Sequence, residues 1–380
     1  MTARDNGFAF TPPWIRIKRP SLIGRHIRFN RRRKVVADHD LFRMLLKVFD
    51  VNLSGDIRVL EGSVRNENWL VNVNGGRVIL KRYKPSLKRE QIQHEHAILD
   101  YLAGQKFPSP RIMHTRSGSS LVEVDGRYYA VFEYLDDYFQ FGEYYYLPDC
   151  SDWFLGSMGR TLARLHAHLK DLSSRDSYVD GYNNRTDGRL RDEEWWLEQL
   201  DLGIEGSRRV GETQRTPIER ELLNQAGWFR ERYQAVSEQI ATARPQTQLI
   251  HGDYGPYNLL VKPGRPLVVV DFELARTDMR VVDLVRALSS TVSVHSKLRP
   301  ADLEKMRRIT GAYLAECPLP DSEVSALPAV WQGSLLLRLF YCWAQYHRDG
   351  KPSWLKEIDN QYRKLRWVSA NEGILSRLGV

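Results

Sequence analysis

Four polar residues between His251 and Asp271 have the types and the spacing that transfer of a phosphoryl group requires. They are His251, Asp253, Asn258 and Asp271, within the stretch LIHGDYGPYNLLVKPGRPLVVVDFELAR (249–276). Phosphoryl transfer needs a carboxylate that orients the acceptor hydroxyl and accepts its proton, and oxygen ligands that hold Mg²⁺ on the phosphates. Asp253 suits the first role, while Asn258 and Asp271 suit the second. The stretch therefore predicts one catalytic base and one metal site.

The order and spacing of these residues resemble a known pattern. An Asp and an Asn five residues apart in a loop, followed by a metal-binding Asp after the next strand, are arranged as in the catalytic loop of protein kinases. His-Gly-Asp at 251–253 replaces the usual His-Arg-Asp, and Val-Asp-Phe-Glu at 270–273 stands in place of Asp-Phe-Gly. In these departures the chain resembles the superfamily of aminoglycoside phosphotransferases, choline kinases and homoserine kinases, over roughly residues 38–350.

That resemblance implies an ATP-dependent kinase that phosphorylates a hydroxyl of a small molecule such as a sugar, an aminoglycoside-like antibiotic or an amino alcohol. By the same resemblance Asp253 is the catalytic base, and Asn258 and Asp271 bind Mg²⁺. His251 and Asp283 would support the loop. His251 by itself is typical of a hydrogen-bonded core histidine, and Asp283 of a helix start or a loop brace. ATP and Mg²⁺ are the expected cofactors, and no motif decides between ATP and GTP.

A lysine in the first half of the chain stands where such kinases bind the α- and β-phosphates. Lys81 lies in VILKRY on a predicted strand. A lone strand lysine is more often a solvated edge residue, but the helix that follows offers Glu95 as an ion-pair partner. Glu90 is a competing candidate for that pair.

Two further segments are expected to contact the nucleotide. EGSVRNEN (61–68) would cover the phosphates through backbone N–H groups and the Ser63 hydroxyl, with Gly62 as its single glycine. After the last predicted strand of this region, the backbone from Glu133 to Leu135 would form the hinge that receives the adenine.

The elements that must position these residues follow from hydrophobic periodicity and turn signals. DHDLFRMLLKVF predicts a helix from about residue 38, with an apolar face formed by Leu41, Met44, Leu45, Val48 and Phe49. Five strands and one further helix follow: strands at 57–62, 68–75 and 77–83, a helix at 89–105, and strands at 120–126 and 127–135. Asn74-Gly75-Gly76 and Asp125-Gly126 supply the turn residues of two hairpins. This part of the chain reads as a five-stranded antiparallel sheet with a helix packed on it.

The rest of the chain is predicted to be mainly helical, interrupted only by short β runs in 247–274. The predicted helices are 153–169, 192–203, 217–240 and several beyond 300, and the segment 136–149 reads as a linker. The prediction is an α+β, protein kinase-like fold. It comprises a basic arm (1–37), a small nucleotide-binding lobe (38–135) and a large helical lobe (136–380) with the catalytic loop and the acceptor site, the two lobes flanking a cleft.

The net charge of +9 is confined to the N-terminal arm. Residues 1–34 contain ten Lys and Arg and one acid, so that 46 basic and 46 acidic residues remain in 35–380. The composition of the arm suits the binding of an anionic partner such as RNA, anionic lipid or an acidic protein. It is equally typical of a solvated segment that packs partly on the body. The body itself carries no polyanion-binding signature.

The remaining composition predicts a cytoplasmic protein. No long uncharged apolar run suggests a membrane span or a secretory signal. The three cysteines have neither disulfide nor zinc spacing. The oligomeric state is not encoded in any feature.

Two other function classes compete with the small-molecule kinase. One is a nucleotide-binding pseudokinase or scaffold recruited through the basic arm, which the complete base and metal set disfavours. The other is an atypical protein kinase, which the short interval from Asp271 to Asp283 and the missing Ala-Pro-Glu motif disfavour. Some acids of the second half would favour a cationic acceptor, although helix starts are commonly acidic: Asp149, Asp152, Asp192, Glu193 and Glu194.

Overall fold

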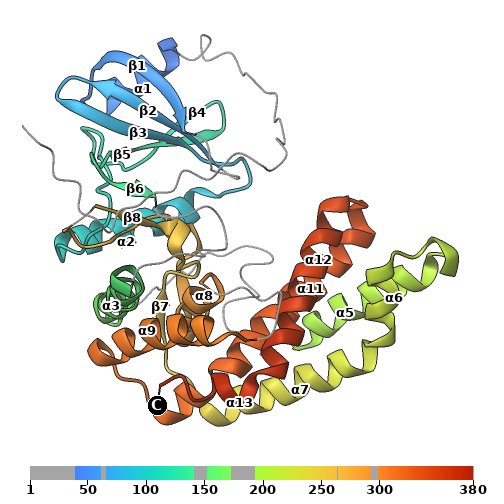
Figure 1. Ribbon diagram of the computed structural model, residues 1–380. Coiled ribbons are helices and arrows are strands. Elements are labelled where there is room, and N and C mark those ends of the chain that lie inside the picture. The colour runs from blue at the N-terminus through green and yellow to red at the C-terminus, as the bar shows by residue number, and fades with distance from the viewer. Residues whose placement is uncertain are drawn as a thin grey trace, which may run out of the picture. The chain divides into compact units, whose positions relative to one another are not determined.

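The computed structural model describes residues 39–60, 66–140, 152–172, 193–262, 264–291 and 298–379. Among these residues a sheet close to the N-terminus is followed by a mainly helical region, shown in blue to green and in green to red in Figure 1. This is the α+β, protein kinase-like organisation that the sequence predicts. Among the helices described, none combines the length and apolar character needed to cross a bilayer.

The N-terminal sheet is antiparallel throughout and has the strand order β1-β2-β3-β5-β4. Its strands are β1 (Leu53–Leu60), β2 (Glu67–Val73), β3 (Gly76–Arg82), β4 (Val122–Val124) and β5 (Arg127–Glu133). Both predicted hairpin turns are present, because Gly75 and Gly76, and Asp125 and Gly126, have positive φ angles. Such angles are what tight two-residue hairpins need.

Helices cover both faces of this sheet. Helix α1 (His39–Val48) packs on one face, where its apolar side chains join Trp69, Leu80 and Val131 in a buried cluster. Helix α2 (Arg89–Gly104) belongs to the larger core on the other face, together with Tyr83, Ala130 and Phe132. Because side chains alternate along a strand, Lys81 points to the α2 face while Leu80 points to α1.

The apolar face predicted for α1 is partly wrong. The sequence carries two overlapping stripes with helical spacing, 41/44/45/48 and 42/45/46/49. The structure buries the second, with Phe42 and Leu46 fully enclosed, and leaves Met44 48% and Val48 40% exposed. The aromatic stripe is buried because Phe42 packs edge-on against Trp69, with ring centroids 4.8 Å apart, a contact that adds to area burial.

The helical region is built around the long buried helix α11 (Leu327–Asp349), which packs against α5, α7 and α12. Its other helices are α3 (Asp152–Leu169), α5 (Glu193–Arg209), α6 (Pro217–Asn224), α7 (Ala226–Ala243), α8 (Val281–Ser289), α9 (Pro300–Glu316), α10 (Asp321–Ser325), α12 (Pro352–Ala370) and α13 (Glu372–Leu375). A short 3-10 turn, η2, spans Glu212–Gln214. The single helix predicted at 217–240 is divided at Gln225 into α6 and α7.

Short strands in the middle of this region frame the predicted catalytic stretch. Strand β7 (Thr247–Ile250) pairs with β10 (Arg276–Met279), and β8 (Leu259–Val261) pairs with β9 (Val268–Val269) and with β6 (Phe139–Gln140). Two 3-10 turns, η3 (Pro256–Asn258) and η4 (Phe272–Leu274), follow the β7 and β9 strands. Residues 251–258 and 270–274 are therefore held between paired strands.

Replacement of Leu46 by Ala is expected to lower the free energy of unfolding by about 2–5 kcal/mol, because it leaves a cavity between α1 and the sheet. Met44→Ala on the other side of the same helix is the matched control and should change stability by no more than about 0.5 kcal/mol. Urea unfolding of the two variants measures both values. A larger loss in Met44→Ala would mean that the helix buries the other stripe.

Candidate active site

His251 stabilises the loop that carries the predicted base. Its Nε2–H donates to the carbonyl of Val270 at 3.0 Å, and its Nδ1 accepts the backbone N–H of Asp253 at 3.2 Å. These contacts together require the neutral tautomer with the proton on Nε2. His251 thus ties the loop after β7 to the strand end that precedes Asp271, a supporting position rather than a reacting one.

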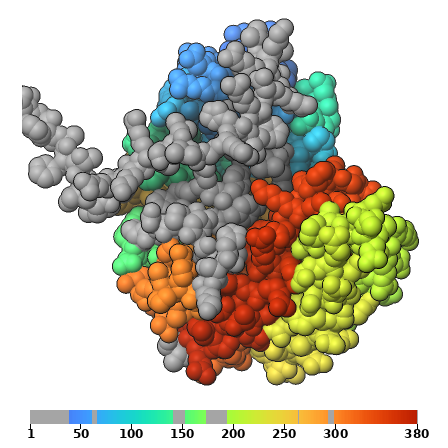
Figure 2. Space-filling view, turned by 45° about the vertical axis from the view of Figure 1, so that its right-hand side comes forward, coloured from blue at the N-terminus to red at the C-terminus, as the bar shows by residue number. Residues whose placement is uncertain are grey.

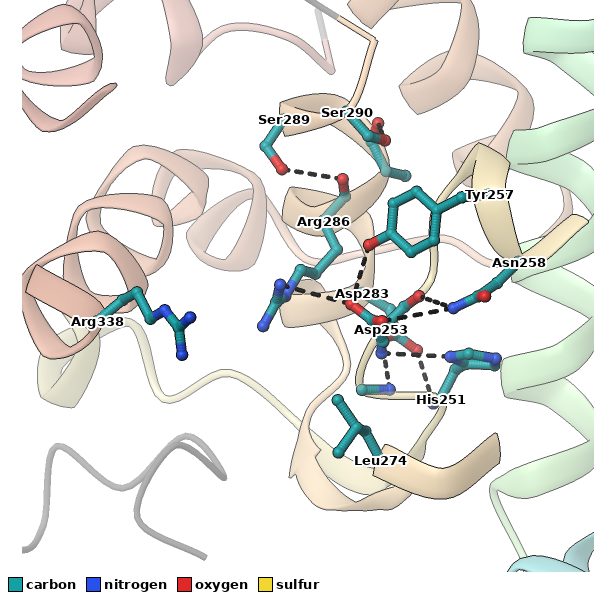
Figure 3. Close-up of polar contacts among 12 residues, drawn as sticks. His251, Asp253, Tyr257, Asn258, Leu274, Asp283, Arg286, Ser289, Ser290 and Arg338 are labelled. Carbon is teal, nitrogen blue, oxygen red and sulfur yellow. Dashed lines mark hydrogen bonds and ion pairs between the residues drawn. The ribbon is translucent and has the colours of Figure 1, made fainter. Parts of the chain in front are cut away.

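Asp283 fixes the same loop through its backbone. Its two carboxylate oxygens accept the N–H groups of His251 and Gly252, both at 2.8 Å, from the first turn of α8 (Figure 3). The side chain is fully buried, and Nε2 of His166 lies 3.2 Å from it. Nδ1 of His166 in turn lies 2.8 Å from the hydroxyl of Tyr313. Two hydrogen bonds thus hold the loop to α8, and His166 holds the carboxylate that accepts them.

The pKa of Asp283 reports how strongly this network favours the carboxylate. Burial works to raise it, but the hydrogen bond and charge of His166 and the backbone N–H of His251 outweigh burial and hold the pKa below its ordinary value. Asp283 is therefore ionised at neutral pH, as a hydrogen-bond acceptor for two backbone N–H groups must be.

Gly252 occupies a position that no other residue fits. Its φ is +78°, and a Cβ there would lie 2.1 Å from the carbonyl oxygen of Leu274 and 2.3 Å from Nη1 of Arg276. The Arg276 guanidinium fills this space and also donates to Asp278 at 2.9 Å and to the Leu274 carbonyl at 3.2 Å. Glycine at 252 is what allows β10 to come this close to the loop.

Asp253 is held by neighbours on three sides and remains partly accessible. The hydroxyl of Tyr257 donates to Oδ1 at 2.9 Å, and Nδ2 of Asn258 donates to the Asp253 carbonyl at 2.9 Å (Figure 3). Nη1 of Arg286 lies 3.5 Å from Oδ1, and 26% of the Asp253 side chain is exposed. An acceptor hydroxyl can therefore reach a carboxylate of fixed orientation.

On the sheet side, Lys81 pairs with Glu95 rather than with Glu90. Nζ lies 3.0 Å from Oε1 of Glu95, on the buried face of α2, whereas Glu90 is exposed in the first turn of that helix. Nζ also lies 4.0 Å from Oδ1 of Asp271. Burial works to lower the pKa of Lys81, but Glu95 and then Asp271 and Glu273 outweigh it and raise the pKa. Lys81 therefore stays charged and lies beside Asp271, the predicted metal ligand.

Asp271 has an unusual backbone and a crowded electrostatic environment. It adopts φ 66° and ψ 68°, a left-handed conformation that is uncommon for residues other than glycine. Partial desolvation, and then the charges of Glu273 and Asp253, raise the pKa of its carboxyl, while Lys81 lowers it. A cation bound here would relieve this repulsion.

The residues present fit a magnesium ion shared with a nucleotide. Among the described residues there is no group of three or more His, Cys, Asp or Glu side chains that could hold a metal alone. Magnesium at nucleotide sites takes one or two protein ligands and completes its shell with phosphates and water. Asn258, whose amide nitrogen is engaged by Asp253, keeps its amide oxygen for such a role, and Asp271 offers a carboxylate.

Glu273 joins the turn that follows Asp271 to the N-terminal sheet. Its carboxylate accepts Nδ2 of Asn66 at 2.6 Å and Nζ of Lys84 at 2.8 Å, and the backbone N–H of Lys84 donates to Asn66 at 3.0 Å. Lys81 and Lys84 outweigh the effect of burial and lower the pKa of Glu273. Asn66, within the expected phosphate-covering segment 61–68, is therefore bonded to the turn that begins at Asp271.

Other predicted positions are only partly covered. Gly62 and Ser63 lie outside the described residues. At the expected hinge, the N–H of Glu133 donates to the Arg111 carbonyl at 2.9 Å, and the carbonyl of Leu135 accepts the Tyr138 N–H at 3.4 Å. Of the five acids considered for a cationic acceptor, Asp149 and Asp192 lie outside the described residues, Asp152 pairs with Arg308, and Glu193 and Glu194 are exposed at the start of α5.

Sequence reasoning missed four residues that contact the predicted site: His166, Glu273 as a bridge, Arg276 and Arg286. Arg286 had a local signal, because it follows Asp283 by three residues and so shares its helix face. The contacts of His166 and Arg276 join segments that are far apart in the chain, and no local pattern encodes them.

Comparison with known proteins finds a matching family and relatives over most of the chain. The model of the phosphotransferase enzyme family matches residues 56–317. A homoserine kinase of Phenylobacterium zucineum is 24% identical over 301 residues, which are 79% of this chain and 83% of that protein.

Solved structures share the fold at low identity. A microcompartment-associated aminopropanol kinase superposes with a TM-score of 0.63 at 20% identity, covering 89% of this chain and 99% of the other. An amicoumacin kinase in complex with AMP-PNP, Ca²⁺ and Ami has a TM-score of 0.59 at 15% identity, covering 90% and 96%.

His96, next to the Lys81–Glu95 pair, is expected to make folding acid-sensitive. It is buried between the Tyr83 hydroxyl and Ser120, each 2.8 Å away. Burial, and then the charges of Lys81 and His114, lower its pKa to about 3. The unfolded chain binds a proton at about pH 6.5 while the folded chain does not, so stability should fall by up to about 1.4 kcal/mol per pH unit below 6.5.

Urea unfolding between pH 7 and pH 5 measures this slope, and His96→Gln should flatten it. His39, on an exposed position of α1, provides the control, because His39→Gln should leave the slope as it is. Equal slopes in the wild type and His96→Gln would show that another group binds the proton.

Gly252→Ala is expected to lower the free energy of unfolding by about 3–5 kcal/mol, since the methyl group displaces Arg276 from its buried pair with Asp278. Gly264→Ala separates this clash from backbone strain, because Gly264 has a similar φ of +73° and nothing within 4 Å of its Cβ position. The control should lose about 1–2 kcal/mol. Chemical denaturation compares the two, and equal losses would mean that the contact with β10 contributes nothing.

Proposed function

The chain belongs to the phosphotransferase enzyme family, a family of small-molecule kinases, and from this we propose that it transfers the γ-phosphate of ATP to a hydroxyl of a small molecule. Asp253 would act as the base, and Asn258 with Asp271 would hold the magnesium ion. This is a phosphotransferase with an alcohol group as acceptor.

The observation that carries the proposal is the convergence of Lys81 and Asp253 on Asp271. Lys81 comes from β3 and lies 4.0 Å from the Asp271 carboxylate, while the charge of Asp253 is close enough to raise the pKa of Asp271. A phosphate-binding cation, a metal ligand and an accessible carboxylate are the parts that phosphoryl transfer needs in one place.

We assign nucleotide binding to the region 38–135. Lys81, oriented by Glu95, would hold the α- and β-phosphates, and Gly62 with Ser63 would cover them. The backbone at Glu133 and Leu135 would receive the adenine. The helical lobe, 136–380, would carry the catalytic loop and the acceptor site, and the basic arm, 1–37, would serve an anionic partner.

The geometry supports the following roles for the chain's own residues. The Asp253 carboxylate would orient the acceptor hydroxyl and take its proton as the new O–P bond forms, while His251 and Asp283 keep the loop still. Lys81 would neutralise phosphate charge. Magnesium, when bound, would supply charge neutralisation and in-line orientation of the γ-phosphate.

The relatives suggest where to search for the acceptor. Their names include a homoserine kinase, an aminopropanol kinase and an amicoumacin kinase, all of them kinases of small molecules. The acceptor of this chain is therefore expected among amino alcohols, hydroxy amino acids, sugars and antibiotics. A pseudokinase is disfavoured because Lys81, Asp253, Asn258 and Asp271 are all retained, which binding alone does not require.

Asp253→Asn should reduce acceptor-stimulated ADP release by about 10²–10⁴-fold, because the amide cannot accept the proton. The assay supplies Mg²⁺-ATP with a panel of these acceptors, and Asp359→Asn on the exposed side of α12 is the matched control. Full activity in Asp253→Asn with a true acceptor would show that another group is the base. ATP binding without turnover on any acceptor would favour the scaffold instead.

A further inference from the structure

A lysine and a tyrosine at the end of β3 face the same side of the sheet. Lys81 and Tyr83 are separated by one residue, and because side chains alternate along an extended chain, both are directed toward α2. Nζ of Lys81 lies 4.6 Å from the centre of the Tyr83 ring and 5.6 Å from that of Phe132. Aromatic faces at these distances attract a cation. This part of the molecule is blue to green in Figures 1 and 2.

Tyr83 also contacts the partner of Lys81. Its hydroxyl donates to Oε2 of Glu95 at 3.1 Å, while Nζ of Lys81 lies 3.0 Å from Oε1 of the same carboxylate. All three side chains are buried. Burial raises the pKa of Glu95, and Lys81 offsets this only in part. Each hydrogen bond donated to the carboxylate therefore favours its charged form, and the Tyr83 hydroxyl helps to keep the ion pair in place.

Two more residues determine the direction of the hydrogen bond from Tyr83. Nε2 of His96 lies 2.8 Å from the Tyr83 oxygen, and Nδ1 of His96 lies 2.8 Å from Oγ of Ser120. A carboxylate only accepts, so the single hydroxyl proton of Tyr83 goes to Glu95, and the Tyr83 oxygen accepts Nε2–H of His96.

The same accounting fixes the far end of the series. A neutral His96 with its proton on Nε2 accepts the Ser120 hydroxyl on Nδ1. Ser120, His96 and Tyr83 thus donate in one direction, toward Glu95. Hydrogen bonds in such a series polarise and strengthen one another.

We propose that Tyr83 is a positioning residue of the nucleotide site. Its hydroxyl, held by His96 and Ser120, fixes Glu95, and Glu95 together with the Tyr83 ring fixes the ammonium of Lys81 where a phosphate of the nucleotide meets it. The proposal rests on the proposed function, since it assigns Lys81 to the phosphates. A cation that is already held in place loses less freedom when the phosphate binds.

Tyr83→Phe separates a positioning role from a purely structural one, because it retains the ring and removes the hydroxyl. A positioning role lowers the affinity of the folded protein for nucleotide. A structural role lowers the free energy of unfolding and leaves that affinity as it is. Nucleotide affinity is therefore the deciding measurement, and urea unfolding without nucleotide shows that each variant is folded.

The experiment titrates the full chain calorimetrically with AMP-PNP in the presence of Mg²⁺. Tyr83→Phe should bind about 5–30-fold more weakly than the wild type, part of what a hydrogen bond to a charged group contributes. Tyr129→Phe is the matched control. It removes the hydroxyl of a buried tyrosine on the other face of the sheet, 3.5 Å from Nη1 of Arg82, and should change the affinity less than about twofold.

A double-mutant cycle tests whether Tyr83 acts through Lys81. Lys81→Met should weaken binding by about 10–100-fold, and the addition of Tyr83→Phe should then cost less than about twofold more. Ser120→Ala, at the far end of the series, should weaken binding by about 2–5-fold and carries the test if Lys81→Met does not fold. Additive losses, an unchanged affinity in Tyr83→Phe, or an equal loss in Tyr129→Phe would overturn the proposal.

The outcomes also separate this inference from the proposed function. If Lys81→Met weakens the binding of AMP-PNP and Tyr83→Phe does not, Lys81 keeps its assigned role and only the positioning role of Tyr83 is rejected. If Lys81→Met binds AMP-PNP as tightly as the wild type, the assignment of Lys81 to the phosphates is rejected, and the inference is rejected with it.

Discussion

The hydrogen bonds from the backbone N–H groups of His251 and Gly252 to the buried carboxylate of Asp283 are the interaction on which the rest of the site depends. They fix the direction of the chain two residues before Asp253, and they connect the loop to α8 and, through His166, to α3. Because a buried carboxylate is stable only when its partners are in place, the loop and the helices are ordered together. The orientation of Asp253 is thus a property of the helical core.

A second set of contacts brings the N-terminal sheet to this loop. Alternation along β3 directs Lys81 away from α1 and toward Glu95 and Asp271, and Glu273 reaches back to Asn66 and Lys84. The turn 271–273 therefore receives one contact at Asp271, the proposed metal ligand, and two at Glu273. The site is assembled from segments nearly two hundred residues apart in the chain, which is why its parts have to be read from the structure.

Much of the fold could be predicted, because its signals are local. The hairpin turns at 74–76 and 125–126 are determined by residues that tolerate positive φ, and the strands and the long helices follow from periodicity. The face of α1 could not be predicted, since two stripes fit a helix equally well and only Trp69, on a strand, selects between them. The division at Gln225 likewise has no local signal.

The same division between local and long-range information applies to the site. The spacing of Asp253, Asn258 and Asp271 is local and was recognisable in the sequence, as was the helix that offers Glu95. What a linear reading lacked were the contacts of His166 with Asp283 and of Arg276 with Gly252, because each joins segments that are far apart in the chain. The acids near helix starts left the class of acceptor open, and the structure adds one cation beside Asp253, Arg286.

Helix α8 carries on one face a residue that holds the loop and a residue that contacts the proposed base. Asp283 in its first turn holds the loop that carries the proposed base, and Arg286 in the next turn lies 3.5 Å from that base. Because the two side chains are separated by one helical turn, a substitution at residue 286 would leave the hydrogen bonds from the loop to Asp283 in place. Such a layout would allow the charge beside Asp253 to change by a single substitution while the backbone that orients Asp253 is conserved.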